Sequence, residues 1–221
     1  MKRAGIWIIA LALVLAFALC ACGTDGETDT AAQGGEEVGT VPQKNVVGDN
    51  AADARGSIAD GVYENAYFGI ACALDGDWEL IAEDRLSELG GEVQNAAYDM
   101  YAIGGGGLYA MNVVVDDIGA KDGVMYDEEG YTDKSLELIE SAEPGSYAPT
   151  AAEKREVTFA GERHYAVYST GQYVLDEFRA ADVYQLAVCV KNGRYVAIVT
   201  FMSFFEDKTA QLSEMWYNVN P

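Results

Sequence analysis

Six carboxylates lie close together in the middle of the sequence. No other group of residues in the chain has a type and spacing that suits metal binding as well. The six are Asp116, Asp117, Asp122, Asp127, Glu128 and Glu129. Calcium takes about six to eight oxygen ligands, which flexible carboxylate-rich loops supply. The spacing departs from the Asp-x-Asp-x-Asp-Gly loop of an EF-hand. Two interpretations of the stretch 116–130 therefore stay open, a calcium site or a solvated acidic loop.

Catalysis by a nucleophile and a histidine base has little support in the sequence. His164 is the only histidine, and it lies in an apolar stretch typical of a strand. Neither a Gly-x-Ser-x-Gly motif nor a cysteine-centred nucleophile motif accompanies it. We therefore expect no catalytic residue and no enzymatic activity. A surface hydrolase built on scattered carboxylates is the least favoured hypothesis.

Tyrosine is unusually frequent, with 14 residues. Tyr165, Tyr168 and Tyr173 precede the acidic pair Asp176 and Glu177. Amphipathic tyrosine rings suit binding surfaces and packed sheet faces equally well. The three rings are thus either the floor of a groove for a peptide, glycan or cationic ligand, or ordinary cross-strand packing.

The chain opens with two basic residues and an apolar run over 4–19, followed by Cys20-Ala21-Cys22. This order is typical of a signal peptide, and the run of 16 residues is shorter than the roughly 20 that a membrane-spanning helix needs. The four residues Leu19-Cys20-Ala21-Cys22 resemble a bacterial lipobox. Small Ala21 precedes Cys22 whereas bulky Leu19 precedes Cys20, so Cys22 is the better candidate for lipidation. The resemblance implies a lipid anchor at Cys22 on the outer, extracytoplasmic face of the cell membrane.

Composition divides the chain into a signal peptide at 1–21, a polar linker at 22–58 and a single domain at 59–221. The linker lacks aromatic residues and apolar periodicity, so it cannot bury a core. The net charge is −22, and it becomes −24 once Lys2 and Arg3 leave with the signal peptide. Such a charge repels nucleic acid and favours a protein partner with a basic surface.

Within the domain, strand-like stretches outnumber helical ones. Period-two or continuous apolar patterns predict strands at 63–74, 97–103, 108–115, 156–159, 163–168, 179–190 and 194–201. Helices are expected over 83–89, from an N-cap at Thr132 to Ile139, and along an apolar stripe over 212–219. Asn192-Gly193 predicts a tight hairpin. The fold class is therefore α+β, with a mostly antiparallel sheet flanked by helices.

A family resemblance agrees with this class. Tyr63-x-Asn65-x-x-Phe68-Gly69-Ile70, followed by Trp78, is similar to the opening of PsbP-like domains, and Phe159-x-Gly161-x-x-x-Tyr165 resembles a second motif of that family. The turn before Trp78 lacks the family's proline. The resemblance implies an antiparallel sheet between helix layers and carries no catalytic residue.

Two further cysteines, Cys72 and Cys189, lie in apolar strand-like stretches. An extracytoplasmic location permits a disulfide, and two buried thiols fit the sequence equally well. The sequence leaves both open.

The sequence as a whole favours a membrane-anchored, non-enzymatic binding or accessory module. The alternative is a lipoprotein that binds a small ligand or a divalent cation, through the acidic stretch or the tyrosines. No cofactor other than calcium is suggested.

The lipid anchor can be tested with a matched pair of variants. We expect an alkyne-tagged fatty acid fed to the producing bacterium to label the wild type and Cys20→Ala, because both keep the thiol that accepts diacylglycerol. Cys22→Ala loses that thiol and should carry no label in a gel of the membrane fraction. Equal labelling of Cys22→Ala would show that Cys22 is not the lipidated residue.

Overall fold

The computed structural model describes residues 54–82, 85–86, 96–120, 126–141, 147–176 and 179–219. The predicted signal peptide, Cys22 and most of the predicted linker lie outside these ranges. Within them, no helix has the length and apolar composition needed to span a bilayer. Ala54 is fully buried and the first strand begins at Ser57, so the end of the predicted linker is part of the fold.

Seven antiparallel strands form the large sheet, in the order β4-β5-β6-β10-β9-β8-β7. Their bounds in chain order are β4 Glu79–Leu80, β5 Ala96–Gly104, β6 Tyr109–Asp117, β7 Tyr147–Phe159, β8 Glu162–Asp176, β9 Arg179–Asn192 and β10 Tyr195–Phe204. All neighbouring strands that pair run antiparallel.

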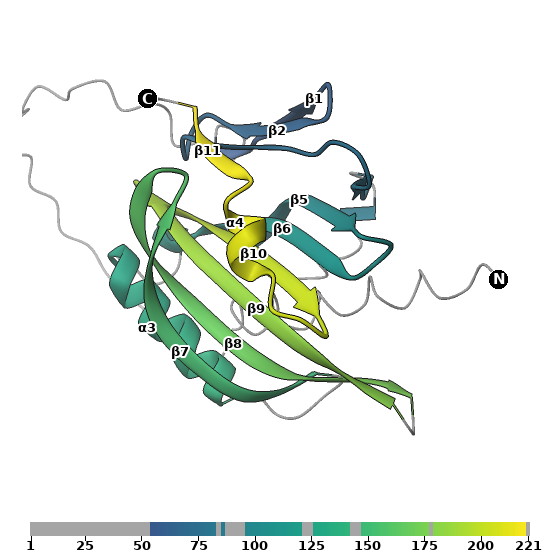
Figure 1. Cartoon of the computed structure of the whole chain (residues 1–221). Coiled ribbons are helices and arrows are strands. Elements are labelled where there is room, and N and C mark those ends of the chain that lie inside the picture. The colour runs from purple at the N-terminus through teal and green to yellow at the C-terminus, as the bar shows by residue number, and fades with distance from the viewer. Residues whose placement is uncertain are drawn as a thin grey trace, which may run out of the picture.

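A second sheet of four strands has the order β1-β2-β3-β11. Its strands are β1 Ser57–Ala59, β2 Val62–Asn65, β3 Ile70–Ala73 and β11 Trp216–Asn218. It joins the two ends of the described chain, because β11 pairs antiparallel with β3. In Figure 1 this small sheet lies above the large one.

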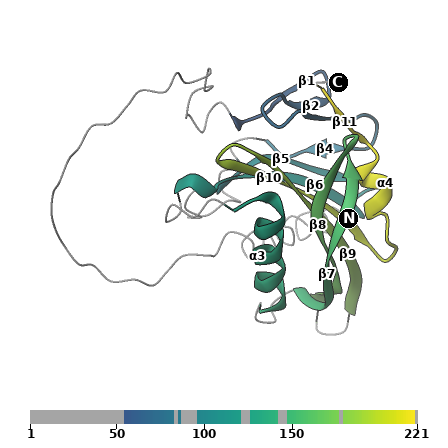
Figure 2. The same cartoon turned by 90° about the vertical axis from the view of Figure 1, so that its left-hand side faces the viewer.

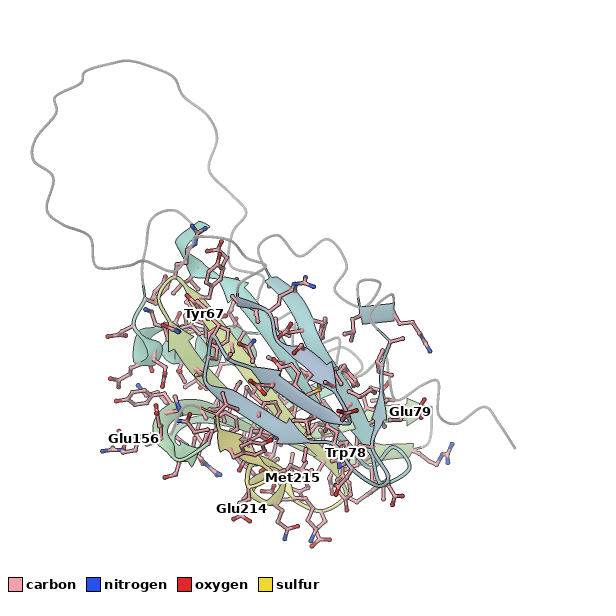
Figure 3. The ribbon with its side chains drawn as sticks, turned by 90° about the horizontal axis from the view of Figure 1, so that it is seen from above. Tyr67, Trp78, Glu79, Glu156, Glu214 and Met215 are labelled. Atoms are coloured by element: carbon pink, nitrogen blue, oxygen red, sulfur yellow. The ribbon has the colours of Figure 1, made fainter. Side chains whose placement is uncertain are left out.

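The two faces of the large sheet have different covers. Helix α3, Glu128–Glu140, lies on one side, and the short helix α4, Thr209–Ser213, lies on the other (Figure 2). A short 3-10 turn, η2 at Ile118–Ala120, follows β6. The small sheet shares its face with α4, since residues of both pack in one apolar cluster. A separate cluster lies between the large sheet and α3.

The sharp turns follow local sequence. Asp60-Gly61 and Ala160-Gly161 both have positive φ at two successive residues, the geometry of a type I′ hairpin turn. At the β9–β10 turn, Gly193 has φ of 56° and Asn192 already pairs with Tyr195. The predicted hairpin is therefore confirmed, with Gly193 and Arg194 as its central residues.

The α+β class and the mostly antiparallel sheet are confirmed, and three local predictions are corrected. Helix α3 begins at Glu128 rather than after Thr132, because the Asp127 carboxylate accepts a hydrogen bond from the Gly130 backbone N–H at 2.8 Å and caps the helix. Thr132 lies inside the helix.

The predicted helix over 212–219 is also wrong beyond Ser213. Trp216 belongs to β11 and pairs with Cys72 of β3. The edge of β3 has backbone N–H and C=O groups that need hydrogen-bond partners, and an extended β11 supplies them. The acidic stretch 116–130 is not one loop either. Asp116 and Asp117 end strand β6, whereas Glu128 and Glu129 open α3.

One carboxylate connects the two sheets. Asp99 lies at a register shift of β5 between Tyr98 and Met100. Its Oδ2 accepts hydrogen bonds from the Gly56 backbone N–H at 2.8 Å, the Tyr63 hydroxyl at 2.6 Å and the Asn65 amide at 3.0 Å. The bulge turns this side chain toward the small sheet.

Asp99→Ala should lower the free energy of unfolding by about 3 kcal/mol, because three donors lose one charged acceptor. Tyr63→Phe should cost about half as much, since Asp99 keeps two partners. Glu140→Ala, at the exposed end of α3, is the matched carboxylate control and should stay within about 0.5 kcal/mol of wild type. Urea unfolding measures all three, and equal effects of Asp99→Ala and Glu140→Ala would contradict the role of Asp99.

Candidate functional site

The first two carboxylates of the acidic group are bound by side chains of the protein. Asp116 is fully buried and its Oδ2 accepts a hydrogen bond from the Tyr131 hydroxyl of α3 at 2.9 Å. Asp117 accepts two hydrogen bonds from the Arg194 guanidinium, at 2.8 and 2.5 Å. Both therefore tie β6 to neighbouring elements.

The carboxylates that open α3 are engaged as well. Asp127 caps the helix, and Glu129 lies 2.9 Å from the Lys154 ammonium of β7. Glu128 points to the end of the β8–β9 ladder. Its carboxylate accepts hydrogen bonds from the backbone N–H groups of Tyr165, at 2.9 Å, and Lys191, at 3.3 Å.

Asp122 lies outside the described residues. Among the residues that the structure does describe, no three His, Cys, Asp or Glu side chains converge on a point that could hold a metal ion. Calcium binding by the acidic group thus stays a prediction from the sequence, and a melting temperature that rises with Ca²⁺ but not with Mg²⁺ is the measurement that decides it.

His164 belongs to the same contact as Glu128. Its Nδ1 lies 3.1 Å from Glu128 Oε2, and its side chain is only 10% exposed. The imidazole packs edge-on against the Phe159 ring. A histidine beside a carboxylate is the arrangement that orients a catalytic base, but here two strand N–H groups share the carboxylate. We conclude that the pair fastens α3 to the sheet.

The structure does not bring the three candidate tyrosines to one face of the sheet. Residues three apart on a regular strand point to opposite faces, so Tyr165 and Tyr168 of β8 lie on different sides of the sheet. Tyr173 is buried in the cluster beneath α3. Tyr165 is half-buried, with the Lys154 ammonium 5.6 Å from its ring.

Tyr168 makes a polar contact on the opposite face. Its hydroxyl donates to Asp207 at 2.7 Å, and the Arg155 guanidinium lies 3.5 Å from the ring centroid. Burial, then the hydrogen bond to Asp207, raises the pKa of Tyr168 to about 12. Burial opposes ionisation of Asp207, yet hydrogen bonds from Thr209 and Tyr168 keep its pKa below the usual value. The hydroxyl therefore stays protonated and the carboxylate charged at neutral pH.

The two domain cysteines are free and buried. Cys72 packs in the cluster under the small sheet, and Cys189 packs in the cluster under α3. Burial raises the pKa of each thiol to about 12, so both stay neutral. The structure therefore has two buried thiols rather than a disulfide between Cys72 and Cys189.

Sequence reasoning missed a line of polar side chains inside the α3-facing cluster. We call it the polar band; its members are Tyr101, Asn112, Thr200, Gln185, Ser169 and Tyr147. All are buried. Each is a polar residue at a core-facing position of a strand, so the signal was a break in the apolar pattern rather than a motif.

An exposed apolar group lies at one end of the large sheet. Phe205 directly follows β10 and is 61% exposed, while Leu108 is 43% exposed. The Phe204 backbone N–H donates to the carbonyl of Leu108, and that of Phe205 donates to the carbonyl of Asp182. These bonds place Phe205 between the start of β6 and strand β9.

No protein-family model and no curated protein matches the sequence. Among solved structures, the cyanobacterial PsbP (CyanoP) of Synechocystis has a TM-score of 0.43 and 13% identity, covering 80% of this chain and 98% of that one. LpqN, involved in cell envelope biogenesis of Mycobacterium tuberculosis, has a TM-score of 0.34 and 15% identity, covering 66% of this chain and 76% of its own.

The protein of unknown function PA94 from Pseudomonas aeruginosa, a putative regulator, has a TM-score of 0.26 and 21% identity, covering 42% of this chain and 58% of its own. A PsbP protein is thus among the structural neighbours. All three likenesses are too distant to say what this chain binds.

The anchoring role of Glu128 can be separated from that of its neighbour. Glu128→Gln should lower the free energy of unfolding by about 2 kcal/mol. The glutamine amide has a single oxygen, so one of the two backbone N–H groups loses its acceptor. Glu129→Gln loses an exposed ion pair with Lys154 and should cost less than about 1 kcal/mol. Urea unfolding compares the two. A Glu128→Gln protein as stable as Glu129→Gln would contradict the anchor.

Proposed function

We propose that this chain is a lipid-anchored extracytoplasmic protein whose folded domain is a non-enzymatic accessory module, docking on a partner protein with a basic surface. The signal peptide, Cys22 and the linker support the anchor. The polar segment 22–53, which precedes buried Ala54, has 32 residues, and a polar chain of that length spans roughly 30 Å, enough for the domain to reach a partner above the bilayer. The docking role rests on the exposure and the backbone conformation of Phe205.

Phe205 combines exposure with backbone strain. Its φ is +68°, in the left-handed region that costs a bulky residue about 1–2 kcal/mol relative to glycine. Core packing does not repay this cost, because the ring is mostly exposed. A strained backbone that presents an aromatic ring to solvent is typical of a binding site, and buried aromatic anchors dominate the affinity of protein interfaces.

The surroundings of Phe205 combine apolar and acidic groups. Leu108 adds exposed apolar area, and exposed Asp182, Glu206 and Asp207 add carboxylates. Together with Phe205 we call these five residues the Phe205 surface. An apolar centre with a charged rim is the usual anatomy of a protein interface.

The charge of the domain favours a basic partner. Many basic side chains are already paired with the protein's own carboxylates: Lys134, Lys154, Arg155, Arg163, Arg194 and Lys208. The excess of acidic residues is therefore not offset by a positive patch formed from these side chains. Such a field steers basic surfaces toward the domain and weakens as salt is added.

The non-enzymatic part of the proposal rests on the described polar groups. The His164–Glu128 pair is bound to backbone N–H groups, and the Tyr168–Asp207 contact has a protonated hydroxyl beside a stable carboxylate. Neither arrangement presents an activated nucleophile.

The docking role is tested on the full chain in native membranes. A carbodiimide joins carboxylates directly to lysines, so it should couple Glu206 or Asp207 to lysines of one partner protein. Phe205→Gly should lower the yield of that adduct about tenfold while the melting temperature holds or rises, because glycine relieves the strain at positive φ.

Tyr217→Ser is the matched control, since Tyr217 is also an exposed aromatic residue, 45% accessible, but lies on β11. It should leave the adduct unchanged, and added salt should reduce the adduct of the wild type. Adducts that do not involve the Phe205 surface, or that survive Phe205→Gly, would overturn the docking role.

A further inference from the structure

The polar band crosses the large sheet as a continuous diagonal. Tyr101 of β5 is paired with Asn112 of β6, and Asn112 with Thr200 of β10. On β9, Gln185 lies two residues from Ala187, the partner of Thr200. Gln185 is paired with Ser169 of β8, whose hydroxyl lies 3.4 Å from that of Tyr147 on β7. Six adjacent strands thus each contribute one polar side chain.

All six side chains lie on the face that α3 covers. Tyr101, Tyr147 and the strand neighbours Val167, Ala187 and Met202 belong to the cluster packed beneath the helix. Every member of the polar band is 7% exposed or less. The band is therefore an interior feature rather than a solvated stripe.

Several polar atoms of the band lack a hydrogen-bond partner among the described residues. They are the Tyr101 hydroxyl, Asn112 Oδ1, and both Nε2 and Oε1 of Gln185. Buried polar groups in native proteins are nearly always paired, and each one left unpaired costs free energy. The sequence keeps four such atoms on one face, which points to a partner that the described residues do not supply.

The chemistry of the band selects the kind of partner. None of its members is charged at neutral pH, and burial raises the pKa of Tyr101 and of Tyr147, so both hydroxyls stay neutral. Asp116, the buried carboxylate on this face of β6, already accepts a hydrogen bond from Tyr131, so burying a charged ligand here would carry a high desolvation cost. The Gln185 amide offers one donor and one acceptor side by side, and another amide complements both.

We propose that the polar band binds a neutral molecule that carries amide groups on an apolar body, held between α3 and the large sheet. The amides pair with Gln185, Asn112 and Tyr101. The apolar body packs on the aliphatic and tyrosine side chains that flank the band. Polar groups on neighbouring strands lie about 5 Å apart, so successive amides of one ligand reach successive members of the band.

The fastening of α3 is compatible with entry of such a ligand. Among the described residues, the polar contacts of α3 to the sheet come from its first two turns: Glu128, Glu129, Tyr131 and Asp133. The last turns contribute apolar Leu136 and Ile139 to the cluster. Among the described residues, entry at the C-terminal half of α3 would break the apolar contacts of Leu136 and Ile139 and no polar contact to the sheet.

The test uses the full lipidated chain in phosphatidylcholine nanodiscs, labelled with ¹⁵N-glutamine. The probes are N-hexylacetamide, hexanoate and hexylammonium, which share a six-carbon chain and differ in charge. We expect N-hexylacetamide to shift the side-chain amide signals of Gln185 saturably. Gln172, exposed on the opposite face of β8, is the internal control and should not move. The two charged probes should bind at least tenfold more weakly.

Two variants complete the test. Gln185→Leu should abolish saturable binding of N-hexylacetamide while its melting temperature holds or rises, because a buried unpaired amide is removed. Gln172→Leu should leave binding unchanged. The proposal is overturned if no probe moves the Gln185 signals of the wild type, which would mean that the band holds water only. Equal affinity for all three probes, or binding that survives Gln185→Leu, would overturn it as well.

Discussion

The structure depends on one strand that must be buried on both sides. Every residue of β10 is buried, and this strand lies in the middle of the large sheet. A sheet whose central strand is apolar on both faces needs a layer above and a layer below. Helix α3 supplies one layer, and the small sheet with α4 supplies the other. The pairing of β11 with β3 follows from the same need, because it closes the small sheet over the apolar face of β10.

The two covers enclose interiors of different chemistry. Under the small sheet, Phe159, Phe201 and Trp216 pack with ring centroids 5.6 to 6.1 Å apart, an arrangement that contributes stability through aromatic contact. Under α3, the polar band takes positions that apolar residues would otherwise occupy. Aliphatic side chains there would raise stability, so the polar choice is a cost that packing alone does not explain. Both interiors bury one face of β10, and the buried polar side chains are what distinguish the second from the first.

Carboxylates stabilise the fold at several places in this acidic protein. Asp99 joins the two sheets through a bulge, Glu128 satisfies N–H groups where the β8–β9 ladder ends, and Asp117 pairs with Arg194 beside the β9–β10 turn. In each case a backbone or side-chain donor near the end of an element needs an acceptor, and a short acidic side chain reaches it. The acidic composition therefore does more than keep the surface soluble. It supplies the acceptors that the irregular parts of the fold require.

The sequence by itself determined the fold class, most of the long strands and the tight turn at Gly193, because alternation and glycine turns are local properties. Asn112 and Gln185 also interrupt apolar strands, a break in the pattern that the sequence analysis missed. Only the tertiary structure decided that these two lie on one face, since strand order and register depend on pairing between distant segments. Tertiary structure also decided that Trp216 forms a strand with β3, although its spacing predicted a helix. It likewise decided the partners of Glu128, because Tyr165 and Lys191 lie far along the chain.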